Sequence, residues 1–286
     1  FSVYFFIANV AMLVILRIDP VVIKMFLALS AVAVYAVAAK IAEYTYLLNK
    51  QFSNALMPLV SQSKGAGDTE IVRRILVDGT RFLLAVAVPF IALLFFYADA
   101  ILIRWMGQEF AEAAPLLRIL LLAVLFSSVQ LNAANVLGMT GEHRFVAFAM
   151  GGSAILNLIL SIVLIQVFGL SGVALGTLLA TLVAEFWLVL PRACRKQGLG
   201  VADFLRHAIW PTIPALIPAL GAAALMAYAQ PPDNFGWIIL QGGIAALLYY
   251  ATFYRTGLSG WERELVVEKA RSIFNRSRAT HLPPTE

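Results

Sequence analysis

Apolar runs long enough to cross a membrane follow one another along most of this chain. Residues 1–58 hold two of them, and six more cover about 82–103, 115–138, 145–168, 170–191, 207–229 and 235–255. A helix needs about 20 apolar residues to cross the hydrocarbon core, and inside lipid it satisfies its own backbone hydrogen bonds. The sequence therefore predicts an all-α, polytopic membrane helix bundle with about eight transmembrane helices.

Composition agrees with a membrane protein and argues against disulfides and metal sites. The chain is 61% hydrophobic and 13% charged, whereas soluble domains are about 45–50% apolar and about 25% charged. Its single cysteine, Cys194, and its scattered histidines, His143, His207 and His281, predict no disulfide framework, no metal site and no cofactor. Most basic residues flank the spans, so the net charge of +5 favours anionic lipids over nucleic acid as partners.

Two registers fit the first two spans. A corner at Pro20 gives spans of about 1–16 and 21–46, of which the first is short for a membrane. A corner near Ser30 gives about 3–27 and 32–56 and leaves Pro20 as a kink inside the first helix. We prefer the second register, which places Arg17 and Asp19 well inside the bilayer.

The segments around the spans suggest three regions. Asp68 or Thr69 can cap a short amphipathic helix before the third span. A basic linker, 192–206, and three prolines at 211, 214 and 218 set the last two spans apart and predict an irregular start for the seventh. We expect a six-helix lobe (1–191), two additional spans (192–256) and a basic cytoplasmic tail (257–286). The tail opens with a capping-box pattern, Ser259 to Glu262, and is expected to be disordered from Arg276 onward.

Basic residues in alternate connections predict the orientation. One set of connections holds 15 of the 21 Lys and Arg residues: Lys64, Arg73, Arg74, Arg81, Arg144, Arg192, Arg195, Lys196, Arg206, Arg255, Arg263, Lys269, Arg271, Arg276 and Arg278. The opposite set holds Arg104, plus Arg17 if the first corner lies at Pro20. Because cytoplasmic loops are enriched in Lys and Arg, the first set and the C-terminus are expected in the cytoplasm.

Ionisable residues of the opening stretch are the first candidates for a site, because a charge within a span costs about 2.5–3.5 kcal/mol on insertion scales. They are Arg17, Asp19, Lys24, Lys40 and Glu43. Structural alternatives stay open: Arg17 with Asp19, and Lys40 with Glu43, can neutralise each other locally, and Lys24 can reach the membrane interface. The functional alternative is that some of them line a central cavity. Tyr35 belongs to a separate helix face that we interpret as packing.

Three later spans each carry one polar stripe at helical spacing. The stripes are Ser128, Asn132 and Asn135; Ser153, Asn157 and Ser161; and Thr177, Thr181 and Glu185. They suggest a shared polar interior, although Ser, Thr and Asn also join helices by hydrogen bonds. Glu185 needs a partner or water inside a span. We include Asn132, Asn135, Asn157 and Glu185 among the candidate cavity residues.

No motif of an enzyme is present in the sequence. A G-x-S-x-G elbow, a P-loop and an H-E-x-x-H are missing, and the external connections are short. The chain is therefore predicted not to be an enzyme, and any work must come from a gradient, from substrate concentrations or from a partner.

Four motifs in order carry a family resemblance. They are Asp19 followed by Val34-Tyr35-Ala-Val-Ala38 and Phe52-Ser-Asn-Ala55-Leu56-Met57-Pro58; Gly107-Gln-Glu-Phe110 with Ala113-Ala114-Pro115-Leu-Leu; Asn135-Val-Leu-Gly138-Met-Thr-Gly141; and Phe168-Gly169-Leu-Ser-Gly172-Val-Ala-Leu-Gly176. Residues 15–190 resemble polysaccharide-lipid flippases of the multidrug/oligosaccharidyl-lipid/polysaccharide exporter superfamily. Val32-Ala33 stands where such proteins often have a Gly before the Tyr.

The resemblance implies two six-helix lobes around a basic central cavity, often with two extra C-terminal helices. This chain would then be the second lobe with the extra helices, and six spans would lie upstream. The resemblance also implies alternating access for a polyprenyl-pyrophosphate-linked oligosaccharide, with the headgroup in the cavity and the lipid tail in the bilayer. The candidate cationic groups are Arg17, Lys24 and Lys40.

The resulting hypothesis is a flippase or exporter of a lipid-linked oligosaccharide, used in surface or exopolysaccharide synthesis in the bacterial inner (plasma) membrane. Its expected partners are the lipid-linked oligosaccharide, anionic lipids, the missing N-terminal lobe and other polysaccharide-assembly proteins. A multidrug/cation antiporter of the same superfamily is the main alternative, and would depend more on Asp19, Glu43 and Glu185. A membrane enzyme of glycan assembly and a scaffold with a recruiting tail are further alternatives.

Overall fold

A computed structural model describes residues 2–65, 68–229, 234–264 and 268. Within these residues the chain is helical, without a β-strand, as predicted. The helices are α1 (Ser2–Phe26), α2 (Leu29–Asn54), α3 (Met57–Gly65), α4 (Thr69–Phe96), α5 (Ala98–Met106), α6 (Ala113–Leu137), α7 (His143–Phe168), α8 (Leu170–Ala180), α9 (Leu190–Lys196), α10 (Val201–Phe204), α11 (Ile213–Ala229) and α12 (Phe235–Thr256). Five segments of other helical type lie between them: η1 (Gln108–Phe110), η2 (Gly138–Glu142), η3 (Thr181–Val189), η4 (Leu205–Ile209) and η5 (Trp210–Thr212).

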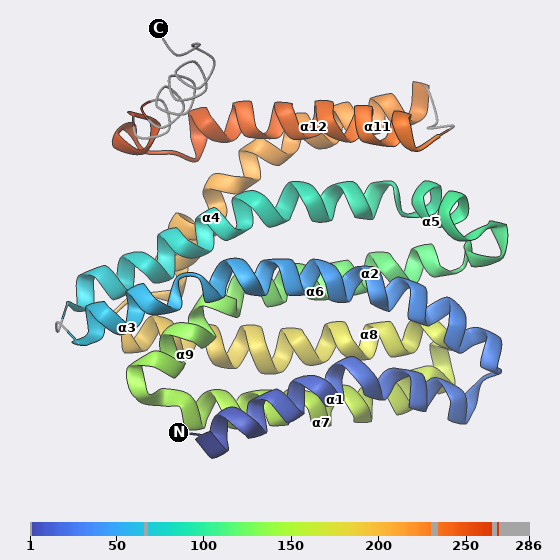
Figure 1. The fold of residues 1–286 in the computed structure, drawn as a ribbon, viewed down its shortest axis with the longest axis horizontal. Helices are drawn as coiled ribbons and strands as arrows, with labels where there is room; N and C mark the ends of the chain where they lie inside the picture. Colours follow the sequence, from blue (N-terminus) through green and yellow to red (C-terminus); the bar gives the residue numbers. More distant parts are fainter. Residues whose placement is uncertain (1, 66–67, 230–233, 265–267, 269–286) are drawn as a thin grey trace, which may run out of the picture.

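The long helices run back and forth roughly parallel to one another (Figure 1). Helix α1 packs on α7, α2 packs on α6, and α6 also contacts α4 and α8. One end of the bundle carries α3, α9 and the α6–α7 turn, and we call it the basic end because Lys64, Arg192 and Lys196 lie there. Helix α5 and the α7–α8 turn lie at the opposite end (Figure 1).

The first corner lies where the preferred register places it, near Ser30 rather than at Pro20. Helix α1 continues through Pro20 to Phe26, and α2 starts at Leu29. A proline inside a helix removes one backbone hydrogen bond and favours a kink, which a long apolar helix accommodates. Asp19 therefore lies inside a helix, within reach of α2 and α8.

The expected short amphipathic helix before the third span is instead the first part of α4. Asp68 caps it by accepting a hydrogen bond from the Ile71 amide at 3.0 Å, as predicted. The helix then continues without a break to Phe96, with both Gly79 and Pro89 inside it. The predicted span of 82–103 was also wrong at its far end, where the chain turns at Tyr97 into α5.

Two glycines make the turns that bring the helices back. Gly141, in the α6–α7 turn, has φ of 97°, and Gly169, between α7 and α8, has φ of 57°. Positive φ is readily adopted by glycine and disfavoured for residues with a Cβ atom. The inner turn and the outer hairpin expected from the sequence motifs are thus both present as turns.

Helices α7 and α8 approach each other closely through the G-x-x-x-G step. A Cβ atom on Gly172 would lie 2.1 Å from the Leu164 carbonyl oxygen, and one on Gly176 would lie 2.7 Å from Ser161 Oγ. Such close contact is the use that small residues have between membrane helices. It holds the polar residues of α7 beside those of α8.

The C-terminal helices form a pair at one side of the bundle (Figure 1). Residues 201–212 are irregular, as the prolines predict, and α11 and α12 then pack on each other and contact α4. Glu262 accepts hydrogen bonds from the amide and hydroxyl of Ser259, so the glutamate half of the predicted capping box is present. Glu262 also forms a partly buried ion pair with Arg81 of α4. The division into a six-helix lobe and two added spans stays a prediction, and the tail residues from 269 onward lie outside the described part.

Six helical stretches among the described residues are long and apolar enough to cross a membrane. One of them, 113–168, contains both α6 and α7, which reverse direction at Gly141. The 25-residue α1 is not among the six. The chain is therefore a multi-pass helical membrane protein, and the number of eight spans stays a prediction.

A glycine substitution tests the close approach of α7 and α8. In Gly172→Ala the new methyl group must push the helices apart, so we expect a loss of about 1–3 kcal/mol in stability, as for other overpacked sites. The measurement is the thermal unfolding midpoint of the purified full-length protein in detergent. Gly151→Ala is the matched control, because no atom lies within 4 Å of its Cβ position; equal midpoints for the two variants would contradict the packing.

Candidate functional site

One cavity of about 110 Å³ lies between α1, α2, α6, α8 and η3. Its wall includes three of the predicted acidic residues, Asp19, Glu43 and Glu185. Thr177, Thr181 and Glu185 reach it from one face of consecutive turns of α8 and η3. The cavity is therefore polar at several points although it lies among apolar helices.

Asp19 joins three helices at this cavity. The Tyr35 hydroxyl of α2 donates a hydrogen bond to Asp19 Oδ2, and the Thr177 hydroxyl of α8 lies 3.3 Å from the same oxygen. Asn157 of α7 donates to Thr177 Oγ1 at 2.9 Å. Asp19 is thus held by neutral donors, and the predicted local pair with Arg17 is not formed.

Three buried oxygens around Asp19 lack a hydrogen-bond donor among the described residues: Asp19 Oδ1, Asn157 Oδ1 and Ser161 Oγ. Buried polar atoms without partners are uncommon and call for an explanation. A carboxylate with neutral oxygens can take up a proton or a small cation. In the described part of the chain no three His, Cys, Asp or Glu side chains group together as a metal site would require.

Glu43 lines the cavity and pairs with two basic side chains that are not among the lining residues. Lys40 Nζ lies 2.8 Å from Glu43 Oε2, which is the predicted pair within α2, and Arg17 Nη2 of α1 lies 3.8 Å from Glu43 Oε1. The Arg17 and Lys40 side chains are 68% and 44% exposed, whereas that of Glu43 is 15% exposed. We call these three residues the Glu43 cluster; it carries one net positive charge.

Lys24 lies in the last turn of α1, exposed and away from this cluster. It does not line the cavity. Its predicted position near one end of a span agrees with the structure, and both its interfacial and its functional interpretation stay predictions.

Asn132 and Asn135 lie in a second polar network, which joins α2, α4 and α6. Ser53 of α2 donates to Asn132 Oδ1 and accepts from Asn135 Nδ2 at 2.9 Å, and Asn132 Nδ2 lies 3.4 Å from Thr80 Oγ1. One turn away, Asn49 donates to Ser128 at 2.8 Å. This stripe of α6 therefore binds helices together, and it does not meet the stripes of α7 and α8.

Glu185 lies in η3, a nine-residue stretch with the wider turns of a π-helix. Its carboxylate accepts hydrogen bonds from Gln130 Nε2 at 2.8 Å and from Ser127 Oγ at 3.1 Å, both of α6, and from Ser153 Oγ of α7 at 3.5 Å. Segments of π-helix are rare and frequently occur at functional sites. The structure thus surrounds Glu185 with neutral partners from two neighbouring helices.

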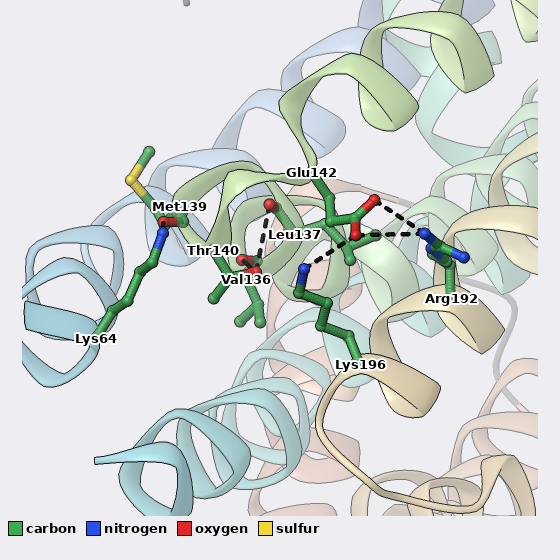
Figure 2. Close-up of polar contacts among 8 residues, drawn as sticks. All are labelled: Lys64, Val136, Leu137, Met139, Thr140, Glu142, Arg192 and Lys196. Atoms are coloured by element: carbon green, nitrogen blue, oxygen red, sulfur yellow. Dashed lines mark hydrogen bonds and ion pairs between the residues drawn. The ribbon is translucent and has the colours of Figure 1, made fainter. Parts of the chain in front are cut away.

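At the basic end, side chains of α3 and α9 bind the α6–α7 turn through a hydrogen bond and ion pairs (Figure 2). Glu142 follows Gly141 and is held by Lys196 Nζ at 2.9 Å and Arg192 Nη2 at 3.2 Å, both of α9. Lys64 of α3 donates to the Met139 carbonyl at 3.1 Å. Glu142 lies in the turn outside the spans, and hydrogen bonds from Lys196 and Arg192 lower its pKa from the usual value.

Sequence reasoning missed Tyr35, Ser127 and Gln130. Tyr35 lies sixteen residues from Asp19 and was interpreted as packing, although a tyrosine on a membrane helix needs a partner for its hydroxyl. Gln130 is a polar residue in an apolar span, which is itself a signal of a buried contact. In each case the sequence did not show which other helix would supply the hydrogen-bond partner.

Residues 5–163, more than half of the chain, match the family model named MatE. The chain belongs to the MatE family. Members of this family are transporters rather than enzymes, in agreement with the sequence-based expectation, and the predicted superfamily of exporters is confirmed.

A curated relative of this MatE chain comes from Haloferax volcanii and is described as a probable low-salt glycan biosynthesis flippase, Agl15. It is 26% identical over 162 residues, which cover 57% of this chain and 34% of the relative. The chain thus spans about a third of the length of that relative.

Two solved structures share the fold over most of the MatE chain. Lipid II flippase MurJ, in an inward closed conformation, gives a TM-score of 0.67 with 19% identity over 88% of this chain and 52% of that one. An outward-facing multidrug resistance MATE family transporter of the MOP superfamily gives a TM-score of 0.61 with 18% identity over 89% and 62%. At this identity the likeness shows the fold alone.

A pair of serine substitutions tests the network between α2 and α6. Ser53→Ala leaves the side-chain amides of Asn132 and Asn135 short of a partner, so we expect a loss of about 1–3 kcal/mol in stability. Ser161→Ala is the matched control: Ser53 and Ser161 are both 0% exposed, and Ser161 Oγ has no partner in the described residues. Unfolding midpoints in detergent measure both, and a larger loss for Ser161→Ala would contradict the network.

Proposed function

We propose that this MatE chain is the C-terminal lobe of an exporter that carries a polyprenyl-pyrophosphate-linked oligosaccharide across the membrane by alternating access, for surface or exopolysaccharide synthesis. Family membership supports transport, and the description of the Haloferax volcanii relative supports a glycan carrier. The headgroup would cross between this lobe and an N-terminal lobe of the same protein, while the lipid tail stays in the bilayer.

The observation that carries the proposal is the Glu43 cluster. Arg17 and Lys40 compete for one carboxylate at the wall of the cavity, and both remain partly exposed. A pyrophosphate presents several acceptor oxygens and binds Arg and Lys by charge-assisted hydrogen bonds. When the headgroup enters, its phosphates can replace Glu43 as the partner of these cations.

The proposed setting is the plasma membrane of a bacterium, with the basic end and the C-terminus in the cytoplasm. Connections rich in Lys and Arg favour that side, and Lys64, Arg192 and Lys196 lie at this end of the bundle. Partners would include anionic lipids of the inner leaflet, attracted by these charges, and other proteins of polysaccharide assembly.

A multidrug/cation antiporter of the same superfamily is the second candidate. It is favoured by the two buried acids, Asp19 and Glu185, which line one cavity and have neutral partners. Such acids suit a cationic substrate or a coupling ion rather than an anionic headgroup.

Neutralising the cluster tests the proposed substrate. Arg17→Gln and Lys40→Gln each remove a charged hydrogen-bond donor worth about 1.5–3 kcal/mol, so roughly tenfold or more of the transport rate at limiting substrate should be lost. The readout is restoration of surface glycan by the full-length gene in a deletion strain, at matched protein levels. Lys24→Gln is the control, because Lys24 is an exposed cation of α1 outside the Glu43 cluster; full restoration by both cluster variants would remove the role of the cluster.

The deletion strain itself separates the two candidate functions. An oligosaccharide exporter predicts loss of surface glycan and accumulation of its lipid-linked precursor on the cytoplasmic side. Normal surface glycan with no accumulation would reject this function, and a greater sensitivity to cationic drugs in the same strain would favour the antiporter.

A further inference from the structure

Positive charge gathers at the basic end, apart from the Glu43 cluster. Residues 138–148, which form the α6–α7 turn and the start of α7, and residues 190–199, which contain α9, hold four basic side chains and one acidic one. These side chains are Arg144, Arg192, Arg195, Lys196 and Glu142. With histidine counted as neutral, four positive charges and one negative charge give a net charge of +3. Such a surface attracts an anion from outside the chain.

Arg192 and Lys196 keep hydrogen-bond donors that Glu142 does not use (Figure 2). The guanidinium of Arg192 lies over the Phe145 ring, 5.5 Å from its centroid, and its Nη2 atom contacts Glu142. Within the described part of the chain, Nε and Nη1 of Arg192 have no hydrogen-bond acceptor. The side chains of Arg192 and Lys196 are 44% and 37% exposed. A phosphate presents several acceptor oxygens to such donors, so this pair can bind one from outside.

The length of α7 places these cations at the depth of lipid headgroups. The helix has 26 residues, or about 39 Å at 1.5 Å per residue. The hydrocarbon core is about 30 Å thick, and the bilayer is about 40–45 Å thick with its polar regions. Glu142 directly precedes α7 and contacts both cations. Arg192 and Lys196 therefore lie near the level of phospholipid phosphates.

An apolar surface continues from this end along the bundle. Ile155 and Ile159 of α7, one turn apart, are 64% and 53% exposed. Trp187 of η3, five residues before Arg192, is 67% exposed. Tryptophan is enriched where lipid meets water, and exposed apolar side chains on a membrane helix suit acyl chains. Groups for a phosphate and a surface for its chains thus occur in the order in which a phospholipid presents them.

We propose that the phosphate of an anionic phospholipid binds Arg192 and Lys196 in competition with Glu142, while its acyl chains lie along α7. The site deepens the proposed partnership with anionic lipids: it rests on the proposed orientation, which puts this end at the inner leaflet, and not on the carried substrate. A lipid that takes both cations releases the α6–α7 turn from its ion pairs with α9. The lipid content of the membrane would thereby act on the turn between two long helices.

The test measures lipid binding to the purified full-length protein in detergent. Native mass spectrometry follows the first bound lipid during titration with dioleoyl phosphatidylglycerol, and with dioleoyl phosphatidylcholine as the zwitterionic reference. We expect phosphatidylglycerol to bind more tightly. Arg192→Gln and Lys196→Gln should each weaken its binding about fivefold, the effect of one Lys or Arg near an anionic membrane surface, and leave phosphatidylcholine unchanged.

Glu142→Gln gives the decisive sign. Because this variant removes the competing carboxylate, it should bind phosphatidylglycerol at least threefold more tightly than the unchanged protein, although it loses the same ion pairs as the two cation variants. A merely structural role of these ion pairs predicts weaker binding in all three. Two exposed residues of the first turns of α4 provide charge-matched controls outside the site: Arg73→Gln and Glu70→Gln should leave the affinity unchanged.

Three results would overturn the site. They are equal affinity for the two lipids, equal weakening by Arg73→Gln and the cation variants, and unchanged or weaker binding in Glu142→Gln. Inorganic pyrophosphate serves as a further probe: if it displaces phosphatidylglycerol in the unchanged protein but not in Arg192→Gln, at concentrations as low as the lipid's own, the ligand is a free phosphate and the assignment to a phospholipid is wrong. These measurements contain no glycan substrate, so failure of this site and failure of the proposed exporter are distinguishable.

Discussion

A polar side chain within lipid needs a partner inside the protein, and this constraint arranges most of the bundle. Asn49, Ser53 and Thr80 meet the polar stripe of α6, and this network joins α2, α4 and α6. Asp19 likewise joins α1, α2 and α8. At these contacts the packing of the helices and the pairing of their polar side chains depend on each other, because the hydrogen bonds form between neighbouring helices.

The two networks differ in how completely they are satisfied. Between α2 and α6, Ser53 meets both neighbouring asparagines. Around the cavity, oxygens of Asp19, Asn157 and Gln130 lack donors within the described residues. Structural polar groups in membranes are usually paired within the protein, whereas functional ones leave room for a ligand or an ion. The buried oxygens without a partner that are named here therefore lie on the cavity side of the described bundle.

The sequence predicted features whose causes are local. Apolar length defined the helices, Pro20 was tolerated inside α1, and Gly141 marked a turn that needs positive φ. The Lys40–Glu43 pair followed from helical spacing. Contacts between distant helices were not predictable in this way: helical periodicity shows which face of α2 Tyr35 occupies, but not that Asp19 lies opposite. The continuous α4 was missed because an amphipathic start and an apolar continuation resemble two separate elements.

The ion pair between Arg81 and Glu262 has a consequence for how this protein is made. The two residues are separated by 181 positions, so a ribosome delivers the arginine long before its acid. Asp78, one turn away at 3.2 Å, can accompany the guanidinium during that interval. Glu262 follows α11 and α12 in the chain, so it can reach Arg81 only after these two helices have been made. The ion pair then joins the C-terminal end of the bundle to α4, which is made much earlier.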